Sequence, residues 1–441
     1  MNNHRLLTGL LVASLCSWGV RAMAGNRQVL TMEELFAVAE QHSAQLRPSF
    51  TAEEVARREI SVAKSGYLPD IEANLSFSYI GDGFTTKRNL SDYQKAAIPH
   101  FGNNFGIDIT QPVYTGGAVS AGVELAKLKS GAAGYSTELQ RDNIRFRLAG
   151  FYLDIYKYGN LREVVESNIR QARKMLGETR DRYDQGMALL NDITRYELLV
   201  SNLELQLVKI NNTLTILNRN LAITAGLEEN TEIVPDSTIL TKALPEADAG
   251  ESWWSRTAEN EAPCLKLARS AVEISRKAED LAKSERLPKI GLQAAWSLEG
   301  PILVEVPPIN RNLSYWYVGV GVSYNISSLY KSNKSLARIR AATHAAAEEL
   351  AAASENVNMA IRAHYVRYME AYEELKTQRK SVELAERNYN TVSTRYSEGM
   401  ALITDMLDAA NSKLDAEQKL VNARIDIIYN YYKLLFTSGK I

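Results

Sequence analysis

Cysteine, a basic excess and catalytic motifs are what this sequence lacks. Only two cysteines occur in 441 residues, and 51 Lys and Arg are balanced by 52 Asp and Glu. A nucleic-acid-binding protein usually shows a basic excess or stripe, so this balance predicts no nucleic-acid partner. The five histidines are scattered, and no H-E-x-x-H, G-x-S-x-G or P-loop pattern is present. We therefore expect no enzyme, no cofactor and no metal site.

Long apolar runs are also missing, except near the amino terminus. Arg5 precedes the apolar stretch LLTGLLVASLCSWGV, and Ala22-Met23-Ala24 then supplies an A-x-A cleavage pattern. We predict a signal peptide over residues 1–24; the alternative is an uncleaved anchor, for which a core of about 15 residues is short. No later stretch reaches about 18 uncharged apolar residues, so we expect no further transmembrane helix.

The two cysteines supply little chemistry. Cys16 lies in the predicted signal peptide, and Leu15 stands where a lipobox requires a small residue, which argues against acylation. Cleavage after Ala24 leaves Cys264 alone, so a disulfide within the chain is excluded. A lone cysteine is more often a small buried apolar residue than a reactive thiol.

What the chain does contain is a duplication. RYDQGMALLND at 182–192 returns as RYSEGMALITD at 395–405, at an offset of 213 residues, and Gly226 pairs with Gly439 at the same offset. Self-similarity of this kind predicts a repeat, and a unit of roughly two hundred residues is too long for a solenoid. We divide the chain into a first repeat (25–226), an equatorial linker (227–250) and a second repeat (251–441).

Each half contains two segments in which apolar residues alternate with small or polar ones. These predicted strands lie around residues 71–79, 105–113, 290–298 and 316–324. Their length of about 9–11 residues suits strands that cross an outer membrane at a tilt, although a half-buried strand of a soluble sheet shows the same pattern. Because the smallest transmembrane barrels have about eight strands, four strands cannot close one. If they are transmembrane, several chains must contribute, and three chains give twelve strands.

Long helical patterns fill the rest of the chain. One helix is expected over 32–64, with Thr31 as its N-cap and Glu34 as the capping-box partner. Residues 118–183 contain no proline and repeat apolar residues in heptad steps, and the second half has similar patterns over 333–398 and 404–436. A helix of this length is a rod of roughly 100 Å, so we expect it to pair along its length as a coiled coil.

The segments at 182–193 and 399–424 resemble the two hairpin tips of the TolC family of outer-membrane efflux ducts. The order of helix, strand pair, long helix, tip and helix also occurs twice, over nearly all of the mature chain. The resemblance implies a mainly α fold with a small β portion. In it, a homotrimer forms a 12-stranded outer-membrane β-barrel that continues into a long 12-helix coiled-coil periplasmic tunnel.

The resemblance also implies a function. The protein would be a passive exit duct in the outer membrane of a Gram-negative bacterium, serving efflux or type I secretion. Its partners would be outer-membrane lipid, a periplasmic adaptor (membrane fusion) protein and an inner-membrane RND or ABC pump. The rival hypothesis is a soluble periplasmic coiled-coil scaffold or adaptor; Trp296 and Trp316 on apolar strand faces favour a lipid-facing band instead.

By resemblance, the periplasmic gate consists of Asp192, Tyr396, Asp405 and Asp408. The last two would form acidic rings that narrow the entrance and favour cations, while Tyr396 would pair with Asp192. Capping is the alternative for Asp192 and Asp405, since an Asp in the first turn of a helix is favoured by exposed N–H groups and the helix dipole. In the first copy, Tyr196 stands nearest the position that corresponds to Asp408, depending on the alignment. The second tip, which carries the acidic residue, is therefore the stronger candidate for the gate.

One departure from the family pattern concerns the latch. A basic residue two positions after the second Gly is replaced here by Ala401. The closed state would then depend on the pair of Tyr396 and Asp192, or on Arg182 and Arg395. Those two arginines alternatively cap the ends of the preceding helices.

The resemblance assigns adaptor docking to the two exposed tips. The docking residues would be Arg182, Gly186, Met187, Leu189, Arg395, Gly399, Met400 and Leu402. The tip methionines suggest either metal efflux or apolar contacts, of which apolar contacts are the commoner explanation. The sequence does not name the cargo.

Overall fold

The computed structural model describes residues 27–236, 238, 249–305 and 307–441. The predicted signal peptide and part of the predicted linker lie outside these residues. Two compact units are present, and each draws on both halves of the sequence. The first combines Ile144–Asp248 and His364–Lys433 with the segment that ends at Gln45, and the second combines Leu46–Asn143, Ala249–Ala363 and Leu434–Ile441.

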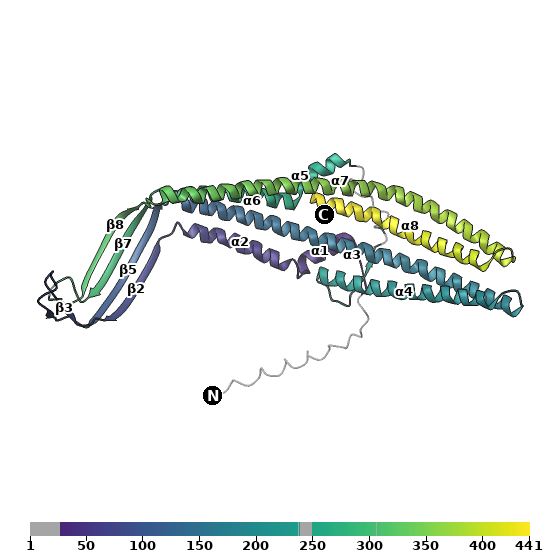
Figure 1. The fold of residues 1–441 in the computed structure, drawn as a ribbon, viewed down its shortest axis with the longest axis horizontal. Helices are drawn as coiled ribbons and strands as arrows, with labels where there is room; N and C mark the ends of the chain where they lie inside the picture. The colour runs from purple at the N-terminus through teal and green to yellow at the C-terminus, as the bar shows by residue number, and fades with distance from the viewer. Residues whose placement is uncertain (1–26, 237, 239–248, 306) are drawn as a thin grey trace, which may run out of the picture. The chain divides into compact units, whose positions relative to one another are not determined.

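Helices make up most of the described chain (Figure 1). They are α1 (Met32–His42), α2 (Arg47–Ser65), α3 (Ala118–Asp184), α4 (Leu190–Ala225), α5 (Glu251–Glu261), α6 (Pro263–Ser284), α7 (Ser328–Ser397) and α8 (Ile403–Ser438). The predicted long helices are therefore confirmed to within a few residues at most ends. No described helix is both long enough and apolar enough to cross a membrane.

The strands are shorter and fall into three sheets. They are β1 (Arg27–Leu30), β2 (Asp70–Tyr79), β3 (Gly83–Thr85), β4 (Gln94–Ala96), β5 (Phe101–Tyr114), β6 (Glu232–Pro235), β7 (Lys289–Gly300) and β8 (Leu313–Ser323). The four predicted strands correspond to β2, β5, β7 and β8. The pairs β1–β6 and β3–β4 were not predicted.

The prediction of a single helix over 32–64 is wrong. α1 ends at His42 and α2 starts at Arg47, with Pro48 in its first turn. Proline has no N–H to bond the carbonyl four residues earlier, so it starts a helix but cannot continue one. The cap at Thr31 is confirmed: its Oγ1 accepts from Glu34 N at 3.2 Å, and Glu34 Oε2 accepts from Thr31 N at 2.8 Å.

Within the first unit, α3 and α4 are joined by apolar side chains at the spacing that the heptad pattern predicted. Six buried residues from α3 and α4 form one cluster: Val165, Ile169, Ala172, Val200, Leu203 and Ile210. Leu207, Leu214 and Leu414 pack against this cluster as partly buried residues. The predicted core stripe is confirmed here.

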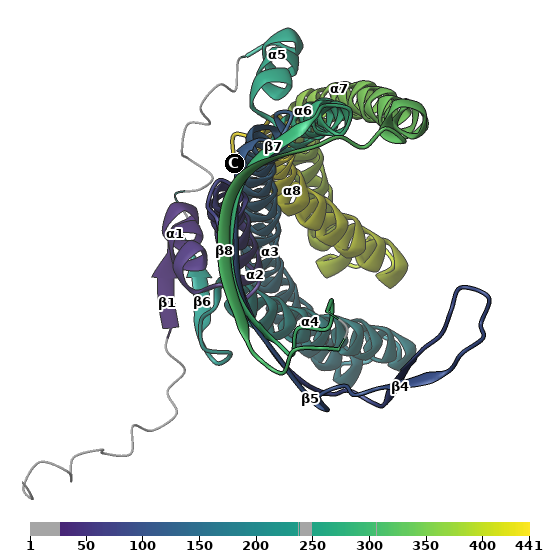
Figure 2. The ribbon, with the colours of Figure 1, turned by 90° about the vertical axis from the view of Figure 1, so that its left-hand side faces the viewer.

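The second unit contains the four-stranded sheet, which is antiparallel with the order β2-β5-β7-β8. Figure 2 shows that the sheet is curved. Among the described strands, β2 and β8 each pair on one side only, so the sheet has two open edges.

The strand register places the apolar positions of all four strands on one face. One row across that face consists of Ile71, Ile109, Ala294 and Val318. The neighbouring row consists of Ala73, Ile107, Trp296 and Trp316. The opposite face carries polar or small residues, with tyrosines on β8. One row there consists of Glu72, Asp108, Ala295 and Tyr317, and the next consists of Asn74, Gly106, Ser297 and Tyr315.

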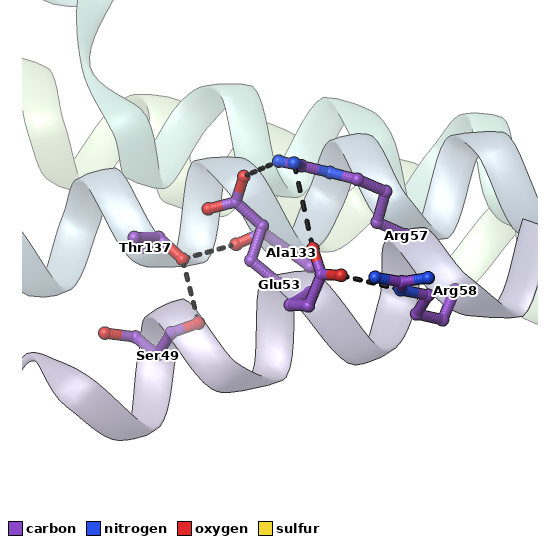
Figure 3. Close-up of polar contacts among 7 residues, drawn as sticks. Ser49, Glu53, Arg57, Arg58, Ala133 and Thr137 are labelled. Atoms are coloured by element: carbon purple, nitrogen blue, oxygen red, sulfur yellow. Dashed lines mark hydrogen bonds and ion pairs between the residues drawn. The ribbon is translucent and has the colours of Figure 1, made fainter.

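In the same unit, α2 lies against α3 (Figure 3). Thr137 Oγ1 of α3 donates to Ser49 O of α2 at 3.3 Å and to Ala133 O of its own helix at 3.1 Å. Ion pairs also run along α2, with Arg57 Nη2 3.0 Å from Glu53 Oε1. Exposed i,i+4 pairs of this kind contribute a few tenths of a kcal/mol, about 0.3–0.5 each.

Candidate functional site

The repeated motif forms the same helix-stopping turn in both hairpins of the first unit. Gly186 and Gly399 are left-handed, with φ of 75° and 77°. In the first tip, Gly186 N donates to Tyr183 O and Met187 N donates to Arg182 O, both at 2.8 Å. This is the Schellman pattern, in which glycine avoids the strain that a Cβ causes at positive φ.

The second tip repeats this turn bond for bond. Gly399 N donates to Tyr396 O at 3.1 Å, and Met400 N donates to Arg395 O at 2.7 Å. The duplicated letters of the sequence therefore encode a duplicated turn between two antiparallel helices.

The predicted gate carboxylates Asp192 and Asp405 lie at the starts of the returning helices. Asp192 Oδ2 accepts from Leu189 N at 3.1 Å, and Asp405 Oδ2 accepts from Leu402 N at 3.1 Å. Each carboxylate satisfies an N–H group that the first helical turn leaves free, which supports the capping interpretation. Their role in gating stays a prediction.

Asp408 lies one turn further into α8 and is exposed. The two returning helices α4 and α8 begin at Leu190 and Ile403, which is the same offset of 213 residues as the motif. With that offset the counterpart of Asp408 is Arg195, rather than Tyr196 as the sequence suggested. The two tips therefore carry opposite charges at this position.

Tyr396 is buried in an apolar cluster that joins the two hairpins. The other buried members are Met175, Tyr196, Tyr389, Met406 and Ala409, and Ala401 packs against them. Burial raises the pKa of the Tyr196 hydroxyl, which has no hydrogen-bond partner among the described residues. Tyr196 therefore stays neutral, as an apolar packing residue.

Arg182 crosses from the first hairpin to the second. Its Nη1 donates to Tyr396 O at 2.8 Å and its Nη2 donates to Ser397 O at 3.1 Å. The guanidinium also lies 5.4 Å from the centre of the Tyr396 ring. Arg182 thus caps the carboxyl end of α7, where the helix dipole favours a cation.

This contact differs from the predicted pairing of Tyr396 with Asp192. In the part of the chain that is described, the side chain of Asp192 bonds to Leu189 N and none of its hydrogen bonds reaches Tyr396. Sequence reasoning placed Arg182 at the tip but missed that it caps the other hairpin. Ala401, which stands in place of the basic residue of the family pattern, packs against the apolar cluster around Tyr396.

The apolar side chains among the predicted docking residues are exposed. Met187 and Met400 are 61% and 67% exposed, and Leu189 and Leu402 are each 69% exposed. Among described residues, no group of three His, Cys, Asp or Glu side chains is placed to bind a metal ion.

Comparison with known proteins decides the family. The model of a family described as "Outer membrane efflux protein" matches residues 35–227 and 254–439. The chain belongs to this family. The two matched ranges correspond to the two halves of the duplication, and the resemblance to TolC-like proteins is confirmed.

Individual members of the family are distant from this chain in sequence. Outer membrane protein TolC of Salmonella enteritidis is 19% identical over 100% of this chain and 87% of that protein. Outer membrane efflux protein BepC of Brucella suis biovar 1 is 21% identical over 93% of this chain and 85% of that protein.

Solved structures of outer-membrane proteins share the fold. The outer membrane protein VceC of Vibrio cholerae superposes with a TM-score of 0.74 at 16% identity, covering 92% of this chain and 96% of that one. The CmeC outer membrane channel of Campylobacter jejuni superposes with a TM-score of 0.72 at 13% identity, covering 93% of this chain and 85% of that one.

Proposed function

We propose that the chain forms a homotrimeric exit duct of the outer membrane. It passively conducts substrates from a periplasmic adaptor and an inner-membrane pump to the exterior of a Gram-negative cell. Residues 25–226 and 251–441 are the two repeats of the duct, 227–250 is an equatorial linker, and 1–24 is the signal peptide. The observation that carries the proposal is the four-stranded sheet with one apolar face and two open edges.

The apolar face is too exposed for a soluble sheet. Ile71 is 64% exposed, Trp316 74%, and Val318 and Val320 69% each. A contiguous apolar patch of this kind marks a surface that is covered by another molecule or by lipid. Alternation of apolar and polar faces over strands of 10 to 14 residues suits an outer-membrane strand whose apolar side contacts lipid.

The open edges then require other copies of the chain. Unpaired N–H and C=O groups are not tolerated against lipid, so β8 of one copy pairs with β2 of the next until the sheet closes. Three copies give a closed barrel of 12 strands, from the four strands that each chain supplies. In the same trimer, the hairpins α3–α4 and α7–α8 of the copies line a tunnel of 12 helices.

The two tips close the periplasmic end of this tunnel. Tyr396 and its cluster hold the two hairpins of one chain together, and Asp192, Asp405 and Asp408 contribute negative charge near the entrance. Repetition of these carboxylates around an axis concentrates the field in a narrow pore, which favours cations.

The adaptor binds the exposed turns between the helices. Met187, Leu189, Met400 and Leu402 offer apolar side chains that no other part of the described chain covers. An adaptor hairpin with matching apolar residues fits this surface better than a metal ion does. The pump supplies the energy, and the duct itself performs no reaction.

The location of the protein tests the proposal. We expect it in the outer-membrane fraction, soluble only with detergent, as a trimer that conducts ions in planar bilayers. Recovery in the soluble periplasmic fraction would instead support the soluble scaffold.

Two neighbouring positions on β8 give a sharper test of the lipid-facing side. Val318→Lys places a charge on the apolar face and is expected to cost about 2–4 kcal/mol if that face contacts lipid at mid-depth. Tyr317→Lys places the same charge on the opposite face and should leave trimer yield close to that of the wild type. Equal loss of outer-membrane trimer in both variants would refute the assignment of faces.

A further inference from the structure

The two tip arginines are equivalent in the repeat but not in their contacts. Arg182 and Arg395 each precede a Tyr and lie four residues before the left-handed Gly of their turn. Arg182 is half-buried because it caps the end of α7. Arg395 is exposed, and no hydrogen bond or ion pair of its side chain occurs among the described residues.

The two helix ends that such an arginine can cap also differ. The Tyr396 side chain, beneath Arg182, is 7% exposed, whereas its counterpart Tyr183 is 42% exposed. Ser397 O accepts from Arg182, and its counterpart is the carbonyl of Asp184, which accepts no hydrogen bond within the described chain. Asp184 also adds a carboxylate to the negative end of the α3 dipole, as Glu398 does just beyond the end of α7, so both helix ends attract a cation.

We propose that Arg395 caps the first hairpin of a neighbouring copy of this chain. It donates to the carbonyls of the neighbouring copy's Tyr183 and Asp184, and its guanidinium lies over the ring of that Tyr183. The inference rests on the proposed trimeric duct. It adds a specific latch, made between chains, that matches the Arg182 latch within each chain.

The faces of the helices beside the two arginines support this partner. Within the chain, Gln171 of α3 and Asn411 of α8 line the same small cavity between the two hairpins. Gln171 also accepts from Lys413 Nζ at 3.4 Å. The contact between hairpins of one chain is therefore partly polar at this level.

At the offset of 213 residues, the counterparts of Gln171 and Asn411 are Leu384 and Leu198. Leu384 is 50% exposed and lies about three helical turns before Arg395, on the same face of α7. Leu198 is 62% exposed, and Leu205, about two turns further along α4, is 54% exposed. If Arg395 contacts the next copy as Arg182 contacts its own, these leucines meet, and two exposed apolar surfaces cover each other.

Crosslinking tests the geometry directly. In a Cys264→Ser chain, Arg395→Cys with Asp184→Cys places one thiol on each side of the proposed contact between chains. The matched pair, Arg182→Cys with Ser397→Cys, does the same for the contact within the chain. A bismaleimide with a short spacer is added to outer membranes, and the products are separated on a denaturing gel.

The two pairs should give different products. The pair at 395 and 184 is expected to yield covalent dimers and trimers, while the pair at 182 and 397 yields monomers with both thiols consumed. If the 395–184 pair gives only monomers, or no crosslink while the trimer is intact by native mass, the proposed latch is wrong. Absence of any trimer from the wild-type membrane would instead refute the duct proposal.

Conductance measures what the latch does. Arg395→Ala is expected to raise the open fraction of single channels roughly tenfold, which corresponds to about 1.4 kcal/mol. Arg395→Lys should recover only part of the closed state, because lysine lacks the planar fork that bonds two carbonyls. Arg379→Ala removes an equal charge from another exposed position of α7 and should conduct as the wild type does. Channels of Arg395→Ala that resemble those of Arg379→Ala would overturn the inference.

Discussion

Asp405→Asn separates the two roles that this carboxylate can have. The amide oxygen of Asn still accepts the hydrogen bond from Leu402 N, which the carboxylate accepts at 3.1 Å, but the charge is gone. Asp405→Ala removes both the charge and the acceptor. Loss of a capping acceptor costs about 1 kcal/mol, so we expect the Ala variant to lower the melting temperature and the Asn variant to leave it nearly unchanged.

Asp408 isolates the charge from the cap. It is exposed and lies beyond the first turn of α8, so Asp408→Asn changes little besides the charge. An ion about 7 Å from a carboxylate in water gains about 0.6 kcal/mol. A ring of three carboxylates gives nearly 2 kcal/mol, which a Debye length of about 8 Å reduces to roughly 0.7 kcal/mol. The ring repels an anion by the same energy, so each ring changes the cation-to-anion permeability ratio by about 1.4 kcal/mol, or about tenfold.

Reversal potentials under a salt gradient in planar bilayers measure this ratio. We expect Asp405→Asn and Asp408→Asn each to lower the cation preference, and the double variant to lower it further. Asp181→Asn is the control, because it removes an equal charge from the exposed surface of α3. If both Asn variants keep the reversal potential of the control, the carboxylates do not line the entrance and the capping role is sufficient.

Three further outcomes concern stability, each measured by thermal unfolding of the purified protein in detergent. Gly226→Ala is expected to destabilise the protein by about 2 kcal/mol or more, because it adds a strained φ and a clash with the backbone of His42. Gly186→Ala has open space around its Cβ and should cost about 1 kcal/mol, from the strained φ alone. Equal losses in the two variants would contradict the packing. Thr31→Ala removes a capping box and should lower the free energy of unfolding by about 1 kcal/mol. An unchanged melting temperature would show that the cap does not stabilise the protein. Burial holds the pKa of Asp426 above its usual value, so its contribution to stability falls as the pH rises. Asp426→Asn should therefore raise the melting temperature at neutral pH and not in acid, and a reversed pH dependence would refute this.

The long elements of the fold could be predicted because their local signals are strong. Apolar residues at heptad spacing, with no proline over 118–183, gave the range of α3 to within one residue at its end. The break between α1 and α2 was missed although Pro48 marked it, because the helical pattern continues on both sides. The parallel pair β1–β6 was missed for another reason. Each strand has four residues, too few for a period to appear, and the partners are far apart in the sequence.

The faces of the sheet were only half predictable. Alternation in one strand shows which residues share a side, but it cannot show whether the apolar sides of neighbouring strands coincide. That depends on register, and a shift of one residue reverses a face. Pairing of Trp296 with both Ile107 and Trp316 settles it, and joins the apolar sides into one surface.

The tips were predictable as turns but not as contacts, because the same letters occur twice. Arg182 and Arg395 have closely similar local sequence signals, and only the packing of whole hairpins decides which one finds a partner inside the chain. That choice is encoded some distance from the arginines. Gln171 and Asn411 line the cavity between the hairpins of one chain, where Gln171 accepts from Lys413, and Leu384 and Leu198 present apolar surfaces at the equivalent positions.

These two surfaces cannot be exchanged. A second hairpin next to the second hairpin of another copy would bury Leu384 against the polar Asn411, and a first hairpin next to another first hairpin would leave Gln171 without Lys413. A mismatch of this kind costs free energy and excludes the wrong arrangement, as in other interfaces that discriminate between similar partners. Divergence after duplication therefore explains how six similar hairpins in the proposed trimer can take only one alternating order around the ring.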